Sequence, residues 1–146
     1  MRMKLIAMLA IAFCLLLPTA AGAKAHDDGT SQQRQIQVFD VNAGKVIKTA
    51  PNSKEYQDYA KSWLGSVSGL SPKVGVNDKC GYVFRIPLDQ PAAVKAGTVT
   101  VQTSDLFLFY CPGKAQLLLI FDENRKPYLL EFKADIKPFL KSLDIK

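Results

Sequence analysis

The segment Leu106–Phe132, read as LFLFYCPGKAQLLLIFDENRKPYLLEF, restricts the possible fold more than any other part of the chain. Its short apolar runs are separated by polar turns at Pro112-Gly113 and at Asp122–Lys126. Short runs rich in aromatic and branched residues, bounded by Gly, Pro, Asn and Asp, are typical of antiparallel strands joined by tight turns. The segment therefore predicts an antiparallel meander, with which the rest of the chain must pair or pack.

The flanking sequence predicts further strands at Gln35–Val41, Lys45–Ala50 and Gly81–Leu88. Asp89–Gly97 is predicted to be a loop and Thr98–Thr103 a short strand. Together with the meander, these segments predict an α+β fold. We expect a curved, mainly antiparallel sheet of about six to seven strands, with one long amphipathic helix packed on it and a short C-terminal helix that starts near residue 135.

The long helix is predicted from apolar residues at helical spacing. Asn52 suits the N-cap, Glu55 the capping box and Gly69 the C-cap. The apolar stripe consists of Tyr56, Tyr59, Ala60, Trp63, Leu64 and Val67. An aromatic stripe usually packs in a core, so we expect Tyr56 and Trp63 to face the sheet; the alternative is that they cradle a ligand.

The first strand of the meander is apolar on both sides. Phe107 and Phe109 share one face, while Leu106, Leu108 and Tyr110 share the other. A strand that is apolar on two faces needs cover on both. We therefore expect the long helix on one face of the sheet, and the C-terminal helix or a curl of the sheet on the other.

The first 25 residues have the features of a secretory signal peptide. Arg2 and Lys4 form a positive n-region, and Leu5–Leu17 is an apolar region too short to span a membrane. The small residues that follow permit cleavage after Ala23 or after Ala25. We therefore expect a secreted protein, located outside the cell or in the cell envelope.

Cleavage after Ala25 would leave a polar, flexible tail at residues 26–34 and a single domain at residues 35–146. It would remove Arg2, Lys4 and Lys24 from the 19 basic residues and none of the 13 acidic ones, which lowers the formal net charge from +6 to +3. The remaining lysines are scattered. This argues against a nucleic-acid partner and only mildly favours anionic wall polymers or lipid headgroups.

The cleaved chain retains Cys80 and Cys111, and an even pair in an oxidising location favours a disulfide over two free thiols. If residues 89–96 were a simple hairpin loop, Cys111 would lie roughly 20 Å along the strand from the position opposite Cys80, beyond disulfide reach. We therefore expect a different register, in which residues 89–102 form a longer excursion. In that register the facing pairs are Cys80–Cys111, Tyr82–Phe109 and Phe84–Phe107.

Residue types that carry catalysis are scarce. His26 is the single histidine and lies in the predicted tail, which excludes Ser-His-Asp and Cys-His catalysis and His/Cys zinc clusters within the domain. The sequence also has no glycine-rich phosphate loop. We predict no enzyme, no catalytic residue and no cofactor.

One metal site depends on the cleavage position. If cleavage falls after Ala23, the mature chain begins Lys24-Ala25-His26, whose amine, amides and imidazole suit square-planar Cu(II) or Ni(II). If cleavage falls after Ala25, this arrangement is lost and His26 is incidental.

Arg85 lies in the middle of a predicted strand. We expect it on the solvated face, paired with a carboxylate across the sheet; the alternative is an anchor for an anion. Arg85, Tyr56 and Trp63 are the residues that we consider for a binding surface.

Several segments resemble a group of small secreted proteins of Bacillus and related Gram-positive bacteria. They are FDVNAGKVIKT, PNSKEYQDYAKSWLGSVSGL, GYVFRIPL and DENRKPYLLEFKADIKPFLK, and the resemblance spans about Val38–Leu140. It implies export and a single domain, and it carries no activity and no cysteine pattern.

These features lead us to expect a non-catalytic extracellular or envelope-associated binding module, whose partner is a cell-wall polymer or another secreted protein. One alternative is an inhibitor or chaperone-like partner of a secreted hydrolase, acting through a sheet edge or through Asp89–Gly97. A second is a carrier of a small apolar ligand, held between Tyr56, Trp63 and the sheet. The oligomeric state stays open.

Overall fold

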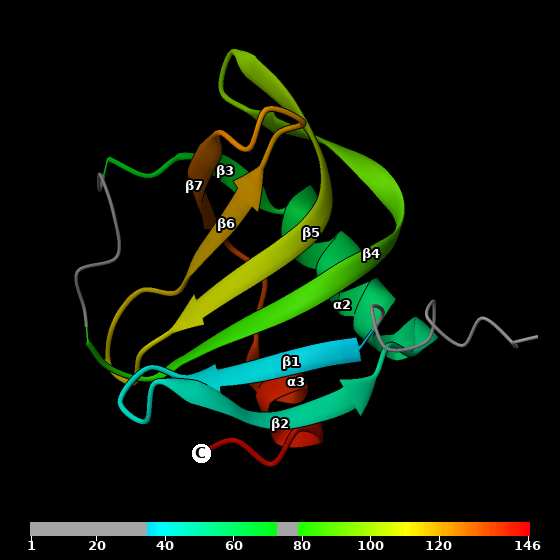
Figure 1. The fold of residues 1–146 in the computed structure, drawn as a ribbon. Coiled ribbons are helices and arrows are strands. Elements are labelled where there is room, and N and C mark those ends of the chain that lie inside the picture. The colour runs from blue at the N-terminus through cyan, green and yellow to red at the C-terminus, as the bar shows by residue number, and fades with distance from the viewer. Residues whose placement is uncertain (1–34, 73–78) are drawn as a thin grey trace, which may run out of the picture.

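Seven strands form one antiparallel sheet in the order β2-β1-β4-β5-β6-β7-β3 (Figure 1). The computed structural model describes residues 35–72 and 79–146, so the predicted signal peptide and tail lie outside the described residues. The strands are β1 (Gln35–Asp40), β2 (Lys45–Pro51), β3 (Val67–Leu70), β4 (Tyr82–Ala96), β5 (Val99–Tyr110), β6 (Leu117–Phe121) and β7 (Pro127–Phe132), and the helices are α2 (Lys54–Gly65) and α3 (Lys137–Ser142). The predicted α+β class and number of strands are confirmed. Neither of these helices is long and apolar enough to cross a membrane.

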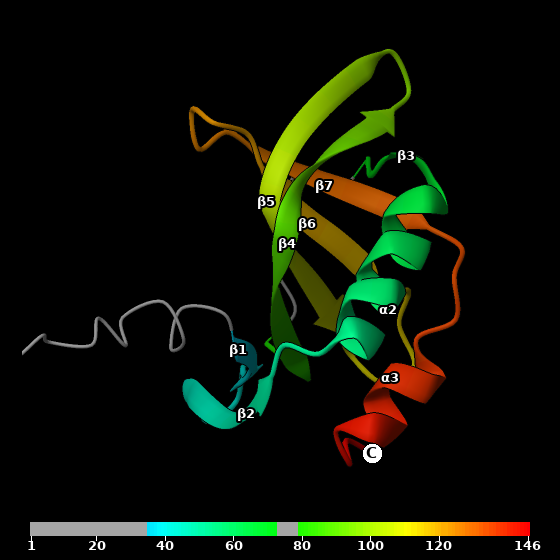
Figure 2. The ribbon, with the colours of Figure 1, turned by 90° about the vertical axis from the view of Figure 1, so that its right-hand side faces the viewer.

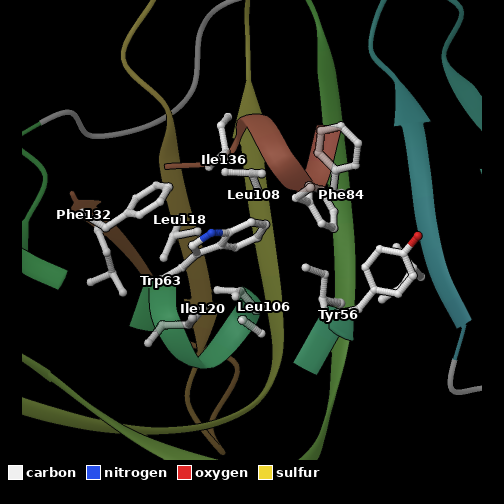
Figure 3. Packing of buried hydrophobic residues seen from close by; sticks show 14 of the residues in the cluster. Tyr56, Trp63, Phe84, Leu106, Leu108, Leu118, Ile120, Phe132 and Ile136 are labelled. Carbon is white, nitrogen blue, oxygen red and sulfur yellow. The ribbon is translucent and has the colours of Figure 1, made fainter. Parts of the chain in front are cut away.

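Both helices pack on the same face of the sheet, here called the inner face (Figure 2). The ring of Phe139 in α3 lies edge-on to Trp63 of α2 at 4.8 Å and to Phe84 of β4 at 5.1 Å, measured between ring centroids. Figure 3 shows Trp63 in this core beside Leu108 and Leu118. The expectation that the C-terminal helix covers the other face is wrong, because α3 completes the core beside α2.

The prediction of one long amphipathic helix is also wrong. Helix α2 has 12 residues and ends at Gly65, well before Gly69. The residues Val67–Leu70 form β3, which pairs with the edge of β7, and the N–H of Ala134 donates to the Ser66 hydroxyl at 3.0 Å. Ser, Val and Gly are weak helix formers. The open edge of β7 offers them backbone hydrogen bonds, so strand pairing overrides the helical pattern.

The start of α2 is held by a polar cluster instead of the predicted capping box. Ser53 occupies the N-cap without a side-chain bond. Asn52 donates through Nδ2 to the Pro87 carbonyl at 2.8 Å and accepts from the Gln57 amide at 2.7 Å. The buried Gln57 also donates to Pro87 at 2.9 Å and accepts from the N–H of Asp89 at 3.0 Å. These bonds satisfy the backbone of β4 where its pairing with β5 is interrupted.

Strands β4 and β5 form one long hairpin that turns at Gly97-Thr98. The predicted loop at Asp89–Gly97 is therefore wrong, because most of it belongs to β4. The register shifts between Pro87 and Ala92, where β4 has more residues than its partner. Because of this bulge, the two strands pair in a different register on each side of it. A simple hairpin would keep one register throughout and would place the two cysteines far apart.

The disulfide between Cys80 and Cys111 is confirmed, and its Cα atoms are 5.6 Å apart. The predicted register is wrong by one residue, since Tyr82 pairs with Tyr110. The cysteines lie just outside the ends of the paired strands. Gly81 is the one residue between Cys80 and the start of β4, and its φ of 76° lies in the region that favours glycine.

Candidate binding surface on the outer face of the sheet

The face of the sheet away from α2 and α3 is here called the outer face, and neither described helix covers it (Figure 2). It carries the rings of Phe107 and Phe109. A one-residue change of register exchanges the faces of a strand. Because Phe84 pairs with Leu108, it is the leucines of β5 that face the helices, and the two phenylalanines face outward.

An apolar row crosses the outer face through directly paired residues of five strands. This outer apolar row consists of Val46, Phe39, Val83, Phe109 and Leu117, on β2, β1, β4, β5 and β6 in that order. Val46 is 46% exposed and Phe39 36%, while Val83 and Phe109 are half-buried and Leu117 is buried. The exposed part of the row is therefore its members on β2, β1, β4 and β5, and exposed apolar patches mark sites of contact with other molecules.

A cleft of about 290 Å³ lies next to this row and is here called the outer cleft. Phe107 and Phe121 line it with their rings edge to face at 5.7 Å, and Phe121 is 36% exposed. The other lining residues are Pro91, Gln102, Thr103, Ser104, Asp105, Asp122 and Glu123. The cleft thus combines aromatic rings with hydroxyl, amide and carboxylate groups.

The carboxylates of the outer cleft differ in how they are held. Asp122 is fixed, because its Oδ1 accepts from the N–H groups of Asn124 and Lys126 at 2.9 Å and its Oδ2 accepts from the Tyr128 hydroxyl at 3.3 Å. Lys126 directs its ammonium over the Tyr128 ring, 5.3 Å from the centroid. Among the described residues, neither Asp122 nor Glu123 has an ion-pair partner. The rim of the cleft therefore carries uncompensated negative charge.

Arg85 lies on the outer face and is paired there. Its Nε donates to Oδ1 of Asp105 at 2.8 Å, and the two side chains are 36% and 34% exposed. This is the carboxylate partner expected across the sheet, and a pair so exposed adds little stability. Arg85 is also the strand partner of Phe107. The outer face therefore already holds one guanidinium paired with a carboxylate.

Tyr56 and Trp63 do not form a binding surface. Trp63 is fully buried and Tyr56 is 9% exposed, and their rings lie 4.8 Å and 5.7 Å from that of Phe139. Figure 3 shows them among the apolar side chains that fill the space between α2 and the sheet. Both rings therefore pack in the core, as expected. The space between them and the sheet, considered for an apolar ligand, is filled by core side chains.

The conditional metal site with His26 lies outside the described residues. Within residues 35–72 and 79–146, no three His, Cys, Asp or Glu side chains come together to hold a metal ion.

Sequence reasoning missed Phe39, Phe121 and Glu123 as surface candidates. The sequence does indicate a second apolar face, because Phe107 and Phe109 alternate with the leucines of the same strand. That face was expected to be covered by another part of the chain. Glu123 lies in the predicted turn at Asp122–Lys126, where acidic residues are common.

Comparisons of the chain with protein-family models, with curated proteins and with solved structures find no match, so any function must be argued from the outer face itself.

Proposed function

We propose that the protein is a secreted, non-catalytic binding module that contacts another secreted protein through its outer face. The observation that carries this proposal is the outer apolar row, which crosses five strands on the side that the helices leave uncovered. The Cys80–Cys111 disulfide is compatible with secretion. An uncovered apolar face loses unfavourable contact with water when a partner covers it.

The outer cleft indicates the chemistry of the partner. Its aromatic residues, Phe107 and Phe121, suit an apolar or cationic side chain, since cations are attracted to the faces of aromatic rings. The carboxylates of Asp122 and Glu123, which form no ion pair among the described residues, add negative charge beside those rings. The occupant that fits is a protein segment with an apolar side chain next to a lysine or arginine, and the Arg85–Asp105 pair shows that this face already holds one cation against a carboxylate.

The sheet edges are less suited to binding than the face. The edge strand β2 carries Lys45 and Lys48 and ends at Pro51, and its pairing with β1 contains a bulge. The other edge, β3, has only four residues. Lysines, proline, bulges and short length all protect an edge from pairing with another chain.

The test is cross-linking of the tagged mature protein during secretion, followed by identification of the captured proteins. The variant Phe121→Ser removes an exposed ring of the outer cleft, and Glu123→Lys reverses a charge there. We expect both to lose a captured partner that the unchanged protein retains. Matched controls are Leu70→Ser, which changes another exposed apolar residue, and Glu55→Lys on α2; both should retain the partner.

The purified partner, mixed with each variant, gives the decisive measurement. A partner that binds the Phe121→Ser and Glu123→Lys variants as tightly as the unchanged protein would overturn the proposal. So would equal weakening by the control variants.

A second candidate is an inhibitor or chaperone-like partner of a secreted hydrolase. The observation that favours it is the end of the β4–β5 hairpin around Gly97-Thr98, which extends beyond the neighbouring strands (Figure 1). Stoichiometric loss of hydrolase activity on adding the protein, abolished when residues 95–100 are replaced by a short turn, would support it. Unchanged hydrolase activity would exclude it.

A further inference from the structure

The C-terminal end of the fold holds a second surface with the opposite charge. A hollow of about 310 Å³ is lined by Lys137, Leu140, Lys141, Asp144, Ile145 and Lys146, and is here called the lysine hollow. Three of its four charged side chains are cationic. Figure 1 places α3 at the opposite end of the molecule from the β6–β7 turn that borders the outer cleft, so the two surfaces are separate.

The backbone beneath the lysine hollow is fixed. The N–H of Asp144 donates to the Lys141 carbonyl at 3.0 Å and the N–H of Ile145 to the Leu140 carbonyl at 2.9 Å, and Asp144 has φ of 53°. This is the Schellman arrangement that ends a helix. Lys48 of β2 donates to the Leu143 carbonyl at 2.5 Å and ties this end to the sheet.

The lysines of the hollow form no ion pair among the described residues, and Asp144 is the one acidic side chain that shares the hollow with them. Lys137 and Lys141 are four residues apart on one helix, a spacing at which like charges repel and destabilise the helix. Lys54 at the same spacing in α2 is paired with Asp58 at 2.5 Å, which lowers the pKa of that carboxyl. No residue in the described part of the chain forms such a pair with Lys137, Lys141 or Lys146.

We infer that the lysine hollow binds a linear polyol phosphate, a polymer with repeated phosphate groups and no bases, since no aromatic side chain lines the hollow to stack on bases. Lysine is a compact cation with three donors, which suits phosphate oxygens. Each exposed contact is weak by itself. A chain that presents several phosphates to Lys137, Lys141 and Lys146 at once binds more tightly than its single contacts would. A single phosphate has no such gain in affinity.

A polymer fits this surface better than a bilayer does. Binding in a membrane interface needs an apolar face that enters the headgroup region. Leu140 is buried and α3 contributes no large exposed apolar residue; those residues are Phe39, Val46, Ile47, Leu70 and Phe121. The hollow therefore offers charge without a surface for insertion.

The test is calorimetric titration of the mature protein with poly(glycerol phosphate), with glycerol phosphate and phosphatidylglycerol-containing vesicles as separate arms. We expect the polymer to bind, with an affinity that falls as salt rises from about 50 to 200 mM. The double variant Lys137→Gln/Lys141→Gln should bind roughly 25-fold more weakly, because each lysine that faces an anionic surface raises the affinity about fivefold. Asp144→Asn should bind more tightly, since it removes the single carboxylate side chain of the hollow.

The matched control is Lys61→Gln/Lys95→Gln, which makes the same change in net charge at two exposed lysines elsewhere. It should bind the polymer like the unchanged protein, and melting curves should show that both double variants are folded. Equal weakening in the two double variants would overturn the inference, because only net charge would then matter. Binding of glycerol phosphate or of the vesicles as tight as that of the polymer would also overturn it. None of these outcomes depends on the outer face, so this site and the proposed protein contact fail separately.

Discussion

At the scale of single residues, Gly81 is the position with the least freedom. Its φ of 76° belongs to the left-handed region, and it lies against the end of β5. A Cβ added there would overlap the carbonyl oxygen of Tyr110 and lie 2.8 Å from the Cα of Cys111. The glycine thus permits both the close approach of the two strands and the disulfide.

We expect Gly81→Ala to lower the free energy of unfolding by more than about 3 kcal/mol, through backbone strain and overlap with backbone atoms that cannot move aside. Gly97→Ala is the matched control, because Gly97 has φ of 65° but nothing within 4 Å of an added Cβ. It should cost about 1 kcal/mol, the strain alone. Urea denaturation of both variants measures the difference. Equal losses would show that the contact with Tyr110 is unimportant.

At the scale of elements, the end of α3 shows an unusual choice of residue. Helices commonly end in a residue with positive φ, and glycine is preferred there because it lacks a Cβ. In α3 this position is held by Asp144 with φ of 53°. The hydrogen bonds to Leu140 and Lys141 keep the turn in place despite the strain.

We expect Asp144→Gly to raise the free energy of unfolding by about 1 kcal/mol, since it removes a left-handed non-glycine residue. Asp144→Ala is the control, because it removes the same charge but keeps a Cβ, and it should not stabilise. Thermal melting of the two variants separates backbone strain from charge. A rise in melting temperature for the alanine variant as large as that for the glycine variant would contradict this explanation.

At the scale of the whole molecule, the disulfide joins the two ends of the long β4–β5 hairpin. Cys80 and Cys111 are 31 residues apart in sequence, and the hairpin between them runs from one end of the sheet to a turn beyond the other end (Figure 1). Closing a loop of this length restricts the unfolded chain. It also holds β4 and β5 at the end opposite to their turn.

We expect the double variant Cys80→Ser/Cys111→Ser to lose about 3–4 kcal/mol of unfolding free energy, on the chain-entropy estimate. Reduction of the unchanged protein should give a similar loss, whereas the reductant should not affect the variant. Urea denaturation with and without reductant provides the measurement. A variant as stable as the oxidised protein would show that sheet packing alone sets the register.

Much of the sheet could be predicted from sequence because its turns and strands are set by residues that are close together in the chain. The turn at Cys111–Lys114, with a hydrogen bond of 3.1 Å and φ of 78° at Gly113, follows from Pro-Gly chemistry. The alternation of Phe107 and Phe109 with the leucines showed two apolar faces. The candidate surface could not be predicted in the same way, since alternation does not reveal which face the helices cover.

The sequence alone determined the strands around tight turns, the amphipathic stripe with Trp63 and the pairing of the two cysteines, because propensity, periodicity and cysteine count act within a few residues or within one pair. The tertiary structure decided the rest. The end of α2 depended on the open edge of β7, and the register of β4 and β5 depended on Gly81 and on the bulge that Gln57 supports. The absence of both described helices from the outer face depended on where α3 docks. Each of these outcomes is a competition between distant segments for the same hydrogen bonds or the same apolar surface, and a local pattern does not record which segment prevails.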